Sequence, residues 1–134
     1  MGDYTRLDNQ TICIDTKQDL QELYSNVILS NTRFKTECTK AMAAGIQLII
    51  LTADDEIKSV ADVHKWKNPR REKWFMIKNA QQRGKMLRYK IATKPPASSE
   101  QLQKALETMA ERYGVQFLFC PKQNVGEKII ELLQ

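Results

Sequence analysis

The sequence predicts a three-layer α/β fold, in which helices flank a mixed central sheet. Two observations support this fold class. Short apolar runs alternate with helical patterns along the chain, in the order hairpin, helix, strand, helix, strand, helix. The composition, with 42% apolar and 28% charged residues among 134, is that of one folded domain with a buried core. We therefore interpret residues 1–134 as a single domain with a basic insert or arm at 67–97.

Residues 3–17 are predicted to form a β-hairpin. Its second strand contains the run Thr11-Ile12-Cys13-Ile14 and ends with Asp15-Thr16-Lys17. If residues 8–10 form a three-residue loop, Asp3 lies opposite Asp15, with Cβ atoms about 5 Å apart. A two-residue loop would turn Asp3 to the other face of the sheet. The position of Asp3 therefore depends on a single step of register.

Two helices, a strand and a further short helix are expected next. Asp19 is the expected N-cap of the first helix, whose apolar positions recur through residue 28. A second helix begins at Asn31-Thr32 and ends at Gly45. Residues 46–51 are almost continuously apolar, which indicates a strand covered on both faces. Ser59 and Asp62 predict a capping box for a short helix through residue 66.

The C-terminal part predicts a helix, a strand and a helix. Ser98 and Gln101 form a capping-box pattern for a helix that Gly114 ends. Residues 115–120 predict a second buried strand, and residues 124–133 a last helix. For the basic insert no conformation is predicted, and Gly84 together with weak periodicity argues against one rigid helix.

Composition excludes several classes of protein. Neither a signal peptide nor a membrane-spanning segment is predicted. Cys13, Cys38 and Cys120 are odd in number and far apart in apolar surroundings, so we expect buried free thiols in a reducing cytoplasm. Zinc and haem sites are not expected, and His64, the one histidine, is interpreted as a surface residue.

Positive charge is concentrated in one segment. Residues 65–94 hold eleven Lys or Arg and one acid, a charge of +10, which leaves −5 elsewhere because the net charge is +5. A block of one sign with interleaved aromatic residues favours a nucleic acid partner. The alternative is a poorly ordered basic loop whose aromatics pack on the core. The predicted nucleic-acid contacts are Lys65, Lys67, Arg70, Arg71, Lys73, Trp74, Lys78, Arg83, Lys85, Arg88 and Lys90.

Asp15-Thr16-Lys17 is the strongest candidate for chemistry. Side chains alternate along a strand, so Asp15 and Lys17 share one face. A carboxylate that binds a hard cation, next to an ammonium near the attacking water or the phosphate, suits phosphodiester hydrolysis. With Asp3 in the expected register, two carboxylates could share one ion. The alternative is that these are ordinary solvated surface charges.

The chain also resembles a known family. Gly2-Asp3-Tyr4, Asp15-Thr16-Lys17 and Arg33-Phe34 are similar to motifs of the XPF-type structure-specific endonuclease domain, of the restriction-endonuclease-like PD-(D/E)xK superfamily, and to its small phage and mobile-element forms. The resemblance implies that Asp3 and Asp15 bind Mg²⁺ or Mn²⁺, that Lys17 is the catalytic lysine, and that Arg33 organises the site. It also implies branched or partly single-stranded DNA as the substrate, and a homodimer is an open expectation.

The chain departs from that family in several places. Aspartate replaces glutamate at Asp15, threonine replaces arginine at Thr16, and Thr52 follows the apolar strand where a glutamate is common. Members usually begin with a further strand and helix, so either the chain is a truncated or internally initiated form, or its sheet lacks an edge strand. Two alternatives to a nuclease follow: a non-catalytic nucleic-acid-binding module of the same fold, and a mobile-element protein that binds an acidic host protein.

Overall fold

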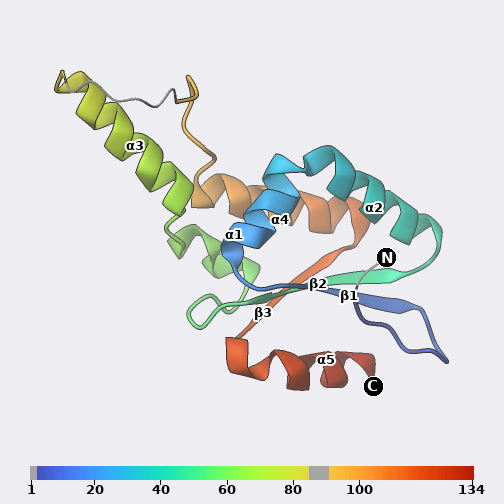
Figure 1. Ribbon diagram of the computed structural model, residues 1–134. Coiled ribbons are helices and arrows are strands. Elements are labelled where there is room, and N and C mark those ends of the chain that lie inside the picture. The colour runs from blue at the N-terminus through green and yellow to red at the C-terminus, as the bar shows by residue number, and fades with distance from the viewer. Residues whose placement is uncertain (1–2, 85–90) are drawn as a thin grey trace.

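The computed structural model describes residues 3–84 and 91–134. Its sheet has three strands, β1 (Ile12–Lys17), β2 (Gln47–Ala53) and β3 (Gln116–Cys120), in the order β1-β2-β3. Helices cover both faces of this sheet, and all three strands end at the same side of the molecule (Figure 1). The predicted α/β architecture with flanking helices is therefore present.

The sheet is parallel, so the prediction of a mixed sheet is wrong for these three strands. β1 pairs with β2, and β2 with β3, in the parallel sense. Helices connect the strands, and such crossovers return the chain to the same end of the sheet. β2 is the central strand, and all of its residues after Gln47 are buried. This explains its continuous apolar sequence.

The predicted hairpin is reduced to one antiparallel bridge, between Tyr4 and Ile14. Its register agrees with the prediction, because it places Asp3 opposite Asp15. The expected three-residue loop is absent. Polar side chains bond locally in its place: Arg6 binds the Asp8 carboxylate at 2.6 and 2.9 Å, and Asn9 accepts hydrogen bonds from Thr11. These local bonds compete with strand pairing.

The main core lies between the sheet and the helices of one face. Those helices are α1 (Leu20–Tyr24), the π-helix η1 (Ser25–Leu29), α2 (Asn31–Ala43), the 3₁₀ helix η2 (Val60–Lys65) and α4 (Ser99–Tyr113). Their apolar stripes meet Cys13 of β1, Leu48 and Ile50 of β2, and Phe117 of β3. Phe34 of α2 packs against Phe117 with ring centroids 6.1 Å apart.

A smaller core lies on the opposite face. There α5 (Val125–Leu133), preceded by the 3₁₀ helix η3 (Lys122–Asn124), packs Ile129 onto Ile14, Ile49 and Leu51. Successive side chains of a strand point to opposite faces of the sheet, so consecutive residues of β1 and of β2 pack into different cores. Asp15 and Lys17 therefore lie on the face of the main core, with Cys13.

Most predicted helix ends are confirmed. The Asp19 side chain accepts a hydrogen bond from Glu22 N at 2.8 Å, and Ser98 and Gln101 form a capping box. Gly45 and Gly114 adopt positive φ at helix ends. The capping box at Ser59 is wrong, because Ser59 makes no side-chain cap and Asp62 instead accepts a hydrogen bond from Lys58 N.

The basic insert begins with a helix that the sequence analysis did not predict. α3 (Pro69–Gln82) starts at Asn68, whose side chain accepts a hydrogen bond from Arg70 N, and it has no buried residue. It leaves the body at the side where the strands end and points away from it (Figure 1). Gly84, at φ 77°, lies just beyond the helix and fits a C-terminal stop.

The three cysteines are buried and unpaired, as expected. Burial raises the pKa of the Cys38 thiol to about 11, with a smaller contribution from Glu37, so this group is inert at neutral pH. His64 is exposed, also as expected, and contacts Gln103. Among the helices of the described residues, none has both the length and the apolar character needed to cross a bilayer.

Candidate active site and nucleic-acid interface

Asp3, Asp15 and Lys17 meet at the carboxyl end of β1. Lys17 Nζ lies 3.2 Å from Asp15 Oδ2, and the two side chains are only 10% and 21% exposed. Asp3 is brought beside them by the backbone bonds of the Tyr4–Ile14 bridge and by its own N–H, which donates to Ile14 O at 2.8 Å. The structure thus brings together the three residues that the predicted register required.

The Asp3 carboxylate is held by the residue between Asp15 and Lys17. Its Oδ2 accepts hydrogen bonds from Thr16 N at 3.1 Å and from Thr16 Oγ1 at 3.0 Å. Thr16 therefore contributes to the site by orienting a carboxylate.

The pKa values of the two carboxyl groups are shifted in opposite directions. For Asp15, burial raises the pKa; Lys17 opposes this and the charge of Asp3 adds to it, so the pKa lies above its ordinary value. For Asp3, burial also raises the pKa, but the hydrogen bonds from Thr16, with Asp15 and Lys17, outweigh burial and lower it. The proximity of the two carboxyl groups contributes to both shifts, since it lowers the pKa of Asp3 and raises that of Asp15. Such divergence is typical of carboxyl pairs with different roles.

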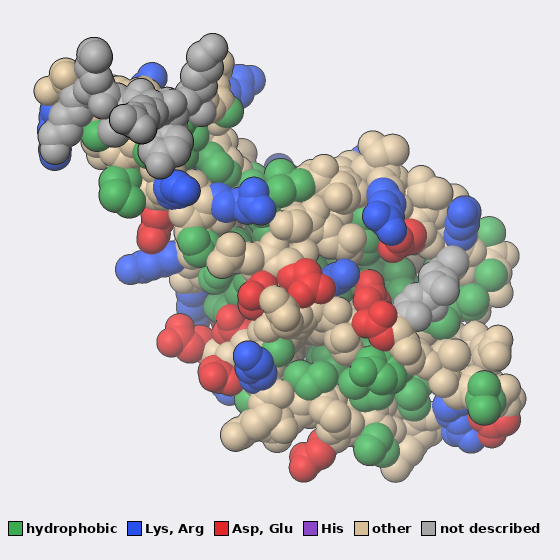
Figure 2. All heavy atoms as spheres, viewed as in Figure 1, with side chains coloured by type: hydrophobic (Ala, Val, Ile, Leu, Met, Phe, Trp, Pro, Cys, Tyr) green, Lys and Arg blue, Asp and Glu red, His purple; other side chains and the backbone are tan. Residues whose placement is uncertain are grey.

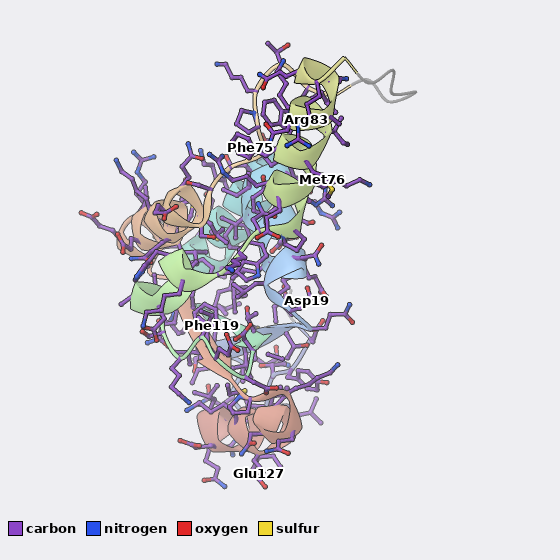
Figure 3. The ribbon with its side chains drawn as sticks, turned by 90° about the vertical axis from the view of Figure 1, so that its left-hand side faces the viewer. Asp19, Phe75, Met76, Arg83, Phe119 and Glu127 are labelled. Carbon is purple, nitrogen blue, oxygen red and sulfur yellow. The ribbon has the colours of Figure 1, made fainter. Side chains whose placement is uncertain are left out.

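A pocket of about 460 Å³ opens beside Asp3 and Lys17 at this edge of the sheet. In Figure 3 the edge is seen end on, with Asp19 at the start of α1 above it and Glu127 on α5 below it. Ligands of open parallel sheets bind outside the carboxyl ends of the strands. The residues that line the pocket are Asp3, Thr16, Lys17, Gln18, Glu22, Ala53, Lys122 and Val125.

The donor set decides which cation would fit. No group of three or more His, Cys, Asp or Glu in residues 3–84 and 91–134 is placed to hold a metal ion. Asp3 and Asp15 offer two neighbouring carboxylates, and Mg²⁺ is commonly held by one or two carboxylates, water and substrate phosphate. Thr52, which pairs with Lys17 in register, adds a buried hydroxyl without a hydrogen-bond partner in the described residues. These residues fit Mg²⁺ or Mn²⁺ and do not fit a closed zinc site.

Arg33 is not brought to this pocket. It lies in the first turn of α2, its side chain is 82% exposed, and its Nε is 3.7 Å from Glu37 Oε1. Its neighbour Phe34 is fully buried in the main core. The role that the resemblance implies for Arg33 stays a prediction without support from the geometry.

The predicted nucleic-acid contacts divide into four groups, of which Arg71 and Trp74 are the last. Lys67, Arg70, Lys73, Lys78 and Arg83 are exposed, and Figure 2 shows blue side chains along the arm above a group of acidic side chains on the body. Lys65 is exposed but lies 3.4 Å from Asp62 Oδ1. Lys85, Arg88 and Lys90 lie outside the described residues.

Arg71 and Trp74 have structural contacts that the sequence interpretation missed. Arg71 Nη1 donates to Pro96 O at 2.7 Å, and its guanidinium lies 5.1 Å from the centroid of the Phe75 ring. Trp74 Nε1 donates to Ala92 O at 2.9 Å. Both side chains therefore tie α3 to the returning chain. Phe75 and Met76 are the large apolar residues of α3 most exposed to solvent (Figure 3).

Two pocket residues were missed by sequence reasoning. Glu22 Oε2 accepts a hydrogen bond from Gln18 N at 3.3 Å, and its position three residues after the N-cap Asp19 was an available signal. Lys122 lies two residues after the end of β3, and a parallel sheet would have placed it at the same edge as Lys17. Because a mixed sheet was predicted, Lys122 was not expected at the same edge of the sheet as Lys17.

Comparisons with protein-family models, curated proteins and solved structures give no significant match to this chain.

Proposed function

We propose that this protein is a divalent-metal-dependent DNA endonuclease that hydrolyses phosphodiester bonds in branched or partly single-stranded DNA. The observation that supports this most is the convergence of Asp3, Asp15 and Lys17 beside a pocket at the carboxyl edge of a parallel sheet. The α/β architecture with a three-stranded parallel sheet is compatible with the restriction-endonuclease-like fold that the sequence resembles. That the chain has this particular fold is part of the proposal.

Four residues at the end of β1 and beside it have roles in the proposed reaction. Asp3 and Asp15 would hold Mg²⁺ or Mn²⁺, which polarises a phosphate and lowers the pKa of bound water when present. Thr16 fixes the orientation of the Asp3 carboxylate through two hydrogen bonds. Lys17 holds its ammonium beside Asp15, where it neutralises charge that develops on the phosphate oxygens.

The basic arm supports DNA as the substrate. Few acidic residues lie near its exposed cations, so these can contact a phosphate backbone and release its counterions. Such contacts do not depend on the base sequence. The arm starts at the side of the molecule where the strands end (Figure 1), and residues at those strand ends line the pocket. DNA bound along α3 would thus reach the carboxyl edge of the sheet.

The test is a cleavage assay on forked and linear DNA with Mg²⁺ or Mn²⁺. Asp15→Asn and Lys17→Ala are expected to lose cleavage by about 100-fold or more and to keep DNA affinity, because they remove charge from the reacting centre alone. Asp8→Asn is the matched control, since Asp8 is an exposed acid whose one ion pair within residues 3–84 and 91–134 is with Arg6. Undiminished cleavage by both pocket variants would exclude this mechanism.

A non-catalytic DNA-binding module is the second candidate. One observation favours it: no third acidic, histidine or cysteine ligand joins the pair in the described residues. This function requires DNA binding that is independent of divalent ions, and no cleavage with either ion. The same assay therefore distinguishes the two candidates.

A further inference from the structure

Lys122 lies at the far end of the pocket from the candidate catalytic residues. Lys17 reaches the pocket from β1 and Lys122 from the end of β3, with Ala53 of the central strand between them. Two inter-strand spacings, about 10 Å in all, therefore separate the strands that carry these two lysines.

The two lysines that line the pocket differ in whether a carboxylate lies beside the ammonium group. The ammonium of Lys17 is already paired with Asp15 at 3.2 Å. Lys122 has no carboxylate within 4.0 Å of its ammonium in residues 3–84 and 91–134. Lys122 is thus the one cation lining this pocket whose charge is available to an anion, while Glu22 and Asp3 add negative charge near Lys17.

The backbone of Lys122 is fixed although its side chain is exposed. Its N–H donates to Asp55 Oδ1 at 3.3 Å, and Asn124 N donates to Pro121 O at 2.9 Å, which closes the 3₁₀ turn of η3. This turn follows directly from a buried strand. The backbone of Lys122 is thus fixed beside the pocket, and its flexible side chain can reach an anion bound there.

We propose that Lys122 is a substrate-binding residue that contacts a backbone phosphate neighbouring the one that is cleaved. The inference rests on the proposed function, and it adds a second phosphate position across the sheet edge from the reacting centre. Because this contact is made in both the ground state and the transition state, it strengthens binding more than it accelerates the chemical step.

The test compares Lys122→Gln with Lys128→Gln. Lys128 is a good control because it lies a few residues later, pairs with Glu131 at 3.6 Å, and lines a neighbouring pocket. The binding arm uses a fluorescent forked DNA in EDTA over a range of salt concentrations. K122Q is expected to raise Kd about threefold to tenfold and to lower the salt slope by about one, with K128Q near wild type.

The cleavage arm uses the same DNA with Mg²⁺. K122Q is expected to raise KM about as much as Kd and to change kcat less than about twofold, whereas Lys122→Arg restores KM. Equal Kd values and salt slopes for K122Q and K128Q would overturn the role of Lys122. Absence of cleavage by the wild-type protein with either ion would overturn the endonuclease instead, and the EDTA measurements still decide whether Lys122 binds phosphate.

Discussion

At the scale of single residues, Asp3 and Asp15 are chemically alike but have different surroundings. Thr16 donates two hydrogen bonds to Asp3, whereas Asp15 is more deeply buried and has one ammonium as its compensation. The carboxylate form is therefore favoured at Asp3 and disfavoured at Asp15. A divalent cation placed between them would favour the ionised form of both, because it offsets their mutual repulsion.

The raised pKa of Asp15 predicts the pH dependence of cleavage. Asp15 must lose its proton to bind the ion, so kcat/KM should rise with pH through a limb that lies above the ordinary aspartate pKa of about 3.9. Higher Mg²⁺ should move this limb to lower pH, because the ion and the proton compete for the same carboxylate. Rates of single-turnover cleavage at two Mg²⁺ concentrations measure the shift. A limb that does not move with Mg²⁺ contradicts the assignment of Asp15 as a ligand.

At the scale of elements, local signals in the sequence predicted most helix ends and both buried strands. The caps at Asp19 and Ser98 depend on residues close in sequence, and the apolar run of β2 depends only on burial. The register of Asp3 was left open between two loop lengths, and the Tyr4–Ile14 bridge agrees with the three-residue alternative. The single bridge at Tyr4 and the loss of the hairpin loop were not predictable, since they follow from competing bonds made by Arg6 and Asn9.

The errors concern contacts between segments that are distant in sequence. The parallel sheet arises from two helical crossovers, and no local pattern of β1 or β3 specifies it. The helix α3 was missed because it has no buried face, so its periodicity is weak. Its contacts to the returning chain, from Arg71 to Pro96 and from Trp74 to Ala92, span 25 and 18 residues.

Two glycines provide a matched test of backbone conformation in the elements. Gly114 ends α4 at φ 68°, where alanine is strained, although nothing lies within 4 Å of an added Cβ. Gly114→Ala should therefore lower the free energy of unfolding by about 1 kcal/mol. Gly126, inside α5, has equal space and no positive φ, so Gly126→Ala should raise the free energy of unfolding by about 0.5–1 kcal/mol. Urea denaturation of both variants measures the two values, and changes of the same sign would contradict the argument.

At the scale of the whole molecule, the proposed function assigns attraction of DNA to the arm and chemistry to the body. The segment 65–94 carries +10 and the rest −5, so the arm attracts a polyanion that the body would repel. A helix of 14 residues with no buried side chain is marginal in water by itself. Bound phosphates would stabilise it by neutralising Arg70, Lys73, Lys78 and Arg83, which face solvent.

This separation predicts that arm variants and pocket variants fail in different ways. Lys73→Gln with Lys78→Gln should weaken DNA binding and reduce the salt slope by about two, because two phosphate contacts are lost. At saturating DNA its kcat should stay within about twofold of wild type, since the Asp15–Lys17 pair is intact. Lys35→Gln with Lys40→Gln, on α2, removes the same charge from the body and should leave binding near wild type.

Binding isotherms at several salt concentrations, together with saturating cleavage rates, separate these outcomes. Asp15→Asn is expected to show the reverse pattern, with binding retained and kcat lost. If the α2 pair weakens binding as much as the arm pair, the attraction comes from net charge alone and the arm has no special part in it. If the arm pair lowers kcat at saturation as strongly as Asp15→Asn does, α3 also positions the DNA at the pocket, and the two functions are coupled through the bound substrate.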